Sequence, residues 1–115
     1  MDSECYNQVI GEKLSAVVFV LDYHQLRFDG PGFTILNPIT VTSGGSGVVA
    51  GEDQFRNRLC EQIAKIVSRV ECREGEELTI GFEDGSTISV SLKDEDYRGP
   101  EAVIFHGHND LCAVI

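Results

Sequence analysis

The strongest constraint in the sequence is a pair of alternating apolar segments on either side of a short acidic turn. Apolar residues occupy every second position in both segments, at Leu78, Ile80 and Phe82 and then at Ile88, Val90 and Leu92. A period of two places such side chains on one face of a β-strand. The Glu-Asp-Gly-Ser sequence at 83–86 is typical of a hairpin turn. The chain is therefore predicted to contain an antiparallel hairpin with one buried face.

Further strands are predicted on both sides of this hairpin. Segments that are apolar or alternating, and rich in β-branched and aromatic residues, occur at 16–21, 25–28, 33–36, 39–41, 101–105 and 111–115. The Asp-Gly-Pro-Gly sequence at 29–32 is a strong turn signal. The first four segments predict a three-stranded antiparallel meander with a short extension, and the last two predict a second hairpin.

An amphipathic helix is predicted over about 52–70. Apolar residues recur at three- and four-residue steps, at Phe55, Leu59, Ile63, Ile66, Val67 and Val70. At about 100° per residue they form one stripe, which must cover a sheet. Glu52 and Asp53 place a cap and negative charge at the expected N-terminus. We therefore expect one α+β domain over 1–115. Its antiparallel sheet is expected to be strongly curved, or a small open barrel, of about six to eight strands with this helix packed on it.

The charge of the chain limits its partners. Nineteen Asp and Glu against nine Lys and Arg give a formal net charge of −10. A surface of this sign is poorly suited to nucleic-acid phosphates or anionic lipid. No apolar run approaches the roughly 18 residues of a membrane span, and the acidic N-terminus lacks the order of a signal peptide. We therefore expect a cytoplasmic protein without nucleic-acid or membrane contact.

The four cysteines are expected to be reduced. No CxxC pair occurs among them, so their spacing does not support a zinc site; they are Cys5, Cys60, Cys72 and Cys112. Disulfides are rare in the cytosol, which favours free thiols, with Cys60 and Cys112 as small core residues.

A polar, mostly basic stripe runs beside the apolar stripe of the predicted helix. It consists of Arg58, Gln62, Lys65 and Arg69. One interpretation is a solvated flank whose charges pair with acidic loops. The other is a docking surface for an acidic partner, including a second copy of the chain.

The best candidate metal ligands are His106, His108 and Asp110. On an extended strand, side chains two residues apart point the same way, so two imidazoles and a carboxylate could converge on a divalent ion. The intervening Gly and Asn instead indicate a turn, which would separate the side chains. A solvated loop is therefore the alternative interpretation.

An enzymatic site is not supported by any recognisable motif. Asp22, His24 and Glu101 are the residues from which an acid–base site could be assembled, but nothing in the sequence places them together. The sequence therefore favours a non-catalytic protein.

Several short motifs resemble those of a family of small, uncharacterised bacterial proteins. They are the Phe-Asp-Gly hairpin at 28–30, the Phe-Glu-Asp-Gly-Ser sequence at 82–86 and the Gly-Pro-Glu-Ala segment at 99–102. The resemblance spans most of the chain and brings no established activity with it.

The expected function is that of a non-catalytic bacterial protein-binding module, with the size and acidity of immunity or antitoxin proteins. The basic stripe and the acidic loops have opposite signs, so self-association into a homodimer is also expected. The alternatives are a small-ligand or metal-binding domain and a small enzyme with an unrecognised site. No cofactor is expected.

Overall fold

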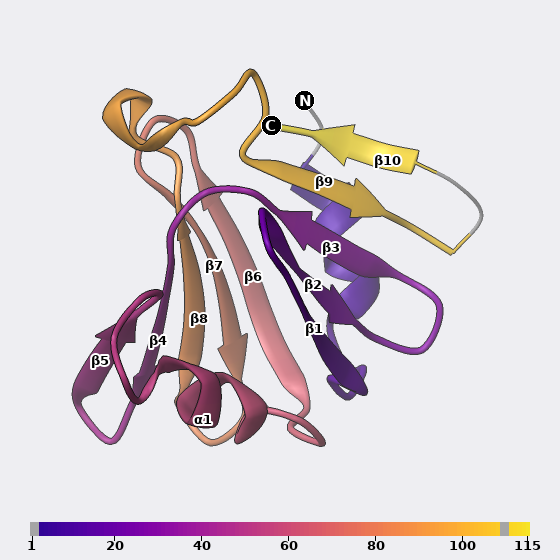
Figure 1. Cartoon of the computed structure of the whole chain (residues 1–115). Coiled ribbons are helices and arrows are strands. Elements are labelled where there is room, and N and C mark those ends of the chain that lie inside the picture. Colours follow the sequence, from indigo (N-terminus) through magenta and orange to yellow (C-terminus); the bar gives the residue numbers. More distant parts are fainter. Residues whose placement is uncertain (1–2, 109–110) are drawn as a thin grey trace.

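The computed structural model describes residues 3–108 and 111–115, and its main elements are two five-stranded antiparallel β-sheets (Figure 1). The first sheet has the strand order β1-β2-β3-β9-β10. Its strands are β1 (Ala16–Val20), β2 (Tyr23–Arg27), β3 (Gly32–Ile35), β9 (Val103–His106) and β10 (Leu111–Val114).

The second sheet has the order β5-β4-β8-β7-β6. Its strands are β4 (Ile39–Ser43), β5 (Ser46–Val49), β6 (Val67–Arg73), β7 (Glu77–Phe82) and β8 (Thr87–Ser91). Three short helical segments accompany the sheets: η1 (Ser3–Val9), α1 (Phe55–Cys60) and η2 (Asp94–Asp96). None of the described helices is long and apolar enough to cross a membrane.

The predicted hairpins are confirmed. Strands β7 and β8 pair with Ile80 opposite Ile88, and both side chains are fully buried. Strands β1, β2 and β3 form the predicted meander, and β9 pairs with β10. The segment after β3 does not extend that meander, because Ile39 starts a strand of the other sheet.

The α+β class and the antiparallel pairing are confirmed, whereas the expected six to eight strands are fewer than the ten found in the described residues. One unexpected strand is β5, which follows a glycine-rich turn. Gly44 and Gly45 have φ values of 60° and 80°, a left-handed geometry that suits a tight hairpin and that glycine adopts without strain. Neither sheet closes on itself, and the expected strong curvature or open barrel is unconfirmed.

The predicted helix over 52–70 is wrong in its extent. Only Phe55–Cys60 is α-helical, and Val67–Arg73 forms β6. Ala64 has a φ of 79°, which is incompatible with continuing a right-handed helix. Beyond it, Val67 and Val70 pair with β7, where β-branched side chains pack well. The three- and four-residue spacing therefore combines a short helix, a turn and a strand.

The two sheets are joined at one corner by backbone pairing between 11–14 and 64–67. The Leu14 N–H donates to the Lys65 carbonyl at 3.0 Å, and the Ala64 N–H donates to the Leu14 carbonyl at 2.8 Å. One residue further, Lys13 and Ile66 form an antiparallel bridge. This pairing lies just before β1 and just before β6, so it fixes where the edges of the two sheets meet.

One hydrophobic core contains side chains from both sheets. Ile88 and Val41 of the second sheet and Leu26 and Phe33 of the first are at most 1% exposed. Tyr6 of η1 stacks on Phe33 with ring centroids 6.1 Å apart, so this segment closes one side of the core. The burial of these side chains stabilises the packing of the sheets.

We expect Ala64→Gly to raise the free energy of unfolding by about 1 kcal/mol. A left-handed conformation costs a residue with a Cβ about 1–2 kcal/mol, and the larger unfolded-state entropy of glycine offsets part of this gain. Urea unfolding followed by circular dichroism measures the change. Ala50→Gly, at a residue without a positive φ, is the matched control and should not be stabilised. Equal effects of the two substitutions would contradict the expectation.

Candidate functional site

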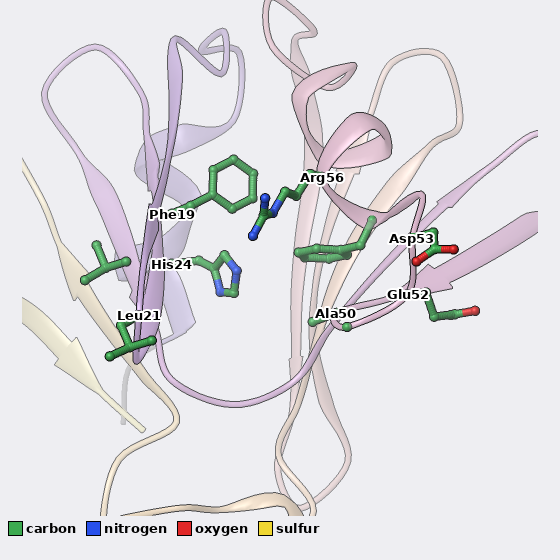
Figure 2. A pocket seen from close by; sticks show the side chains of 10 residues that line it. Phe19, Leu21, His24, Ala50, Glu52, Asp53 and Arg56 are labelled. Carbon is green, nitrogen blue, oxygen red and sulfur yellow. The ribbon is translucent and has the colours of Figure 1, made fainter.

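The most distinctive concave feature is a cleft of about 580 Å³ between the two sheets, here called the inter-sheet cleft (Figure 2). Residues 19–21 and 24, from the β1–β2 hairpin, form one wall. Residues 50–53, 55 and 56, from the β5–α1 connection and the start of α1, form the other. The cleft therefore lies where the edge of the first sheet faces the helix of the second.

His24 lies between two aromatic rings at the centre of this cleft. It is the cross-strand partner of Phe19, and the ring centroids are 5.6 Å apart at an interplanar angle of 80°. On the other side, Phe55 of α1 lies 5.5 Å away at 77°. Both contacts have the edge-on geometry that aromatic rings prefer. The His24–Phe55 contact therefore joins the two walls of the cleft. Phe55 is only 3% exposed, so its ring is held in place by the core.

Three consecutive apolar residues beside the cleft are exposed to solvent. Phe19 is 39% exposed, Val20 38% and Leu21 96%. A run of this kind exposes apolar area at one place on the surface, a feature associated with interaction sites. The sequence predicts a strand over 16–21, but its apolar composition does not show that the end of this strand is exposed.

Charged groups line the α1 wall of the cleft. Figure 2 shows the Arg56 guanidinium directed toward Phe19 and His24, while the carboxyl groups of Glu52 and Asp53 lie further from His24. Glu52 is already engaged, because its Oε1 accepts the Val49 N–H at 2.7 Å. Within the described residues, the Arg56 side chain has no hydrogen-bond or ion-pair partner. A cation is thus available at the mouth of an aromatic site.

The environment of His24 favours its neutral form. Burial lowers the pKa of the imidazole below its usual value, and the positive charge of Arg98 lowers it further. No hydrogen bond to this ring is found in the part of the chain that the structure describes. A neutral imidazole has one N–H donor and one acceptor nitrogen, and both remain available to a bound group.

A second pocket of about 370 Å³ lies next to the hairpin turn. Asp22 and Glu101 both line it, and Arg98 lies in the same wall with its guanidinium donating to the Leu36 carbonyl at 2.6 Å. Two of the three residues named for an acid–base site are therefore brought together, while His24 lines the inter-sheet cleft instead. No hydrogen bond joins His24 to either carboxylate within 3–108 and 111–115.

The residues of the predicted basic stripe do not share a helix face. Arg58 is on α1, where it donates to the Ser46 carbonyl at 2.7 Å. Gln62 is fully buried after the helix, Lys65 lies in the turn, and Arg69 is on β6, where it contacts Glu71 at 2.6 Å. The stripe as a helical surface is therefore wrong, because the helix ends at Cys60. A role for these residues in partner binding stays a prediction.

Gln62 and Lys65 belong instead to a polar cluster that holds the β7–β8 turn. The Ser86 hydroxyl lies 2.8 Å from Gln62 Oε1 and 2.6 Å from Asp84 Oδ1, and it donates its single proton to one of them. Lys65 Nζ lies 2.8 Å from Asp84 Oδ2 and 3.1 Å from Gln62 Oε1. Because Lys65 and Ser86 donate to Asp84, its pKa is far below the usual range. The cluster satisfies a buried amide next to the reversal at Ala64.

The metal site predicted at His106, His108 and Asp110 is only partly described. His106 and His108 are exposed, and Asp110 lies outside the described residues. Within residues 3–108 and 111–115, no group of three His, Cys, Asp or Glu side chains is arranged to hold a metal ion. The metal site therefore stays a prediction.

The cysteines differ from the expectation. Cys60 is an exposed free thiol rather than a core residue, and Cys72 is a half-buried free thiol. Cys5 is disulfide-bonded, so the expectation of four reduced thiols is wrong. The cytoplasmic location, which rested partly on reduced thiols, stays a prediction.

Comparison with family models, with curated proteins and with solved structures gives no match to this chain. The resemblance to a small bacterial family therefore remains a prediction. Phe19, Phe55 and Arg56 had no signal in the sequence as site residues, because the cleft is formed by two segments that meet only in the folded chain.

We expect Ser86→Ala to lower the free energy of unfolding by about 1–3 kcal/mol, because it removes a hydrogen-bond partner from buried Gln62 and from Asp84. Guanidinium unfolding at neutral pH measures the loss. Ser46→Ala, at an exposed serine of β5, is the control and should stay within about 0.5 kcal/mol of the parent protein. Similar values for both variants would show that the cluster does not contribute to stability.

The pKa of His24 gives a pH dependence of defined sign. Since the folded-state pKa lies below the unfolded value of about 6.5, the unfolded chain binds this proton more readily. The contribution to stability is complete above about pH 6.5 and is lost as the pH falls toward the folded pKa. Denaturation midpoints between about pH 8 and pH 5 should therefore fall less in His24→Gln than in the parent protein. His106→Gln, which changes an exposed histidine outside the cleft, should retain the parental dependence.

Proposed function

We propose that this chain is a non-catalytic protein-binding module that receives an apolar side chain of its partner in the inter-sheet cleft. The observation that supports this most directly is the run of exposed apolar residues at 19–21 beside the cleft. Burial of such residues against a partner removes apolar area from water, which is the main favourable term in most protein association. The aromatic floor at His24 and Phe55 would then contact the inserted side chain.

The position of the hairpin in the sheet also supports a protein partner. β1 is one of the two edge strands of the first sheet, the other being β10. An edge strand presents unpaired backbone groups along which an extended segment can align. A partner segment lying along β1 would pass Val20 and Leu21 and reach the cleft. The predicted homodimer is one case of this arrangement, with a second copy of the chain as the partner.

A small-ligand domain is the second candidate, and the volume of the cleft favours it. At about 580 Å³, the cleft falls within the range of about 300–1,000 Å³ typical of ligand sites. The exposure of Leu21 favours a protein partner over a small ligand. Its side chain is 96% exposed, so a small molecule enclosed in the cleft would leave it in solvent. The immunity or antitoxin role and the bacterial origin remain expectations from the sequence.

Site-directed photo-cross-linking in the source cells tests the proposal. Leu21→benzoylphenylalanine places a photoreactive group beside the cleft, and Ile63→benzoylphenylalanine places the same group at another exposed apolar residue, 39% exposed. We expect a discrete adduct from position 21 and none from position 63. An adduct of twice the chain mass of 12.6 kDa would identify a second copy as the partner. The same adducts from both positions, or none from position 21, would contradict the proposal.

A further inference from the structure

Among the described residues, Arg56 differs from most of the other arginines because its side chain has no hydrogen-bond or ion-pair partner. Four others donate to an acceptor of the protein: Arg27 to Gln25, Arg58 to Ser46, Arg69 to Glu71 and Arg98 to Leu36. Arg56 has no such bond among the described residues, although it lines the cleft. Its planar guanidinium therefore retains the pair of donors that matches a carboxylate.

Figure 2 shows this guanidinium pointing across the cleft toward His24 and Phe19. The carboxyl groups of Glu52 and Asp53 extend on the α1 side, further from His24, and Glu52 is held by the Val49 N–H. Within the described residues, neither acid forms an ion pair with Arg56. A cation and a neutral imidazole face the same space.

His24 supplies a second donor to that space. Its ring is fixed between Phe19 and Phe55, and burial together with Arg98 keeps the pKa low. The imidazole therefore presents one N–H, in an orientation set by the two aromatic contacts. A carboxylate between Arg56 and His24 would accept hydrogen bonds from both.

The apolar wall limits what can carry this carboxylate. Phe19, Val20 and Leu21 flank the space, and Phe55 forms its buried side. A ligand with a large apolar group would remove these apolar side chains from water, which is favourable. A ligand with a carboxylate but no apolar group would leave them exposed to solvent. The carboxylate and the apolar group must also be close together, because both walls line one cleft of about 580 Å³.

We propose that the inter-sheet cleft binds the free carboxyl terminus of a partner protein whose last residue is large and apolar. This inference rests on the proposed protein-binding function and names the segment that is bound. Arg56 pairs with the terminal carboxylate, His24 donates a further hydrogen bond, and the last side chain packs between Phe19 and Phe55. Leu21, at the open rim of the cleft, contacts the preceding residue. A chain terminus combines both groups at one Cα, as the cleft requires.

The net charge of −10 does not by itself repel a carboxylate from the cleft, because most of the negative charge lies elsewhere in the sequence. Ten of the nineteen acids lie in residues 71–101 with three bases, whereas residues 52–70 hold three acids and four bases. Charges more than about 8 Å apart are largely screened at physiological ionic strength. The carboxylate therefore responds mainly to the charges that line the cleft, which are those of Arg56, Glu52 and Asp53.

Titration of the ¹⁵N-labelled protein with short peptides tests the inference. The probes are acetyl-Gly-Gly-Phe with a free carboxyl terminus and the same peptide as its carboxamide. We expect the free acid to shift the amide signals of residues 19–24 and 50–56. We also expect it to bind about tenfold more tightly than the carboxamide, because a hydrogen bond to a charged group contributes about 1.5–3 kcal/mol. Arg56→Gln should remove this preference. Arg73→Gln, at an exposed arginine on β6, should retain it.

Two further probes define the chemistry. Acetyl-Gly-Gly-Gly with a free carboxyl terminus lacks the apolar side chain and should bind too weakly to shift the cleft signals. Binding of 3-phenylpropionate as tight as that of the phenylalanine peptide would assign the site to a small aromatic acid and overturn the assignment to a chain terminus. Equal affinity for the acid and the carboxamide, or no shift with either, would also overturn it. Cross-linking from position 21 reports on the protein-binding function independently of these results.

Discussion

The packing of two apolar sheet faces against each other is the interaction on which the rest of the structure depends. Leu26 and Phe33 of the first sheet and Val41 and Ile88 of the second are essentially inaccessible to water. Each sheet alone would leave these side chains exposed, and the short helices cover little of either face. The inter-sheet cleft lies where this packing ends and the two sheets separate.

The alternation of apolar residues was sufficient to predict most of the strands, because one-sided burial imposes a period of two on the sequence. The same reasoning failed over 52–70, where the apolar spacing fits a helix but the chain reverses at Ala64 and continues as β6. Helix and strand compete closely in such a segment. The partner strand β7 decides between them, and no local pattern encodes that pairing. The division into two sheets was missed for the same reason.

The candidate site shows a different limit of sequence analysis. As part of an acid–base site, His24 was grouped with Asp22 and Glu101, two carboxylates that line a neighbouring pocket. Its contacts in the folded chain are Phe19, its cross-strand neighbour, and Phe55, which is distant in sequence. The first contact follows from the register of the β1–β2 hairpin. The second depends on how the sheets are placed, so the cleft could be found only from the folded chain.

The corner at which residues 11–14 pair with 64–67 has a mechanical consequence for the cleft. The pairing lies at the beginning of β1, and Phe19 and Val20 lie at its other end. At about 3.3 Å per residue, the strand separates the two places by about 20 Å. The corner therefore fixes one end of β1, while the other end of the same strand forms a wall of the cleft. Glu12, Lys65 and Ile66 thus help to position a site that they do not line.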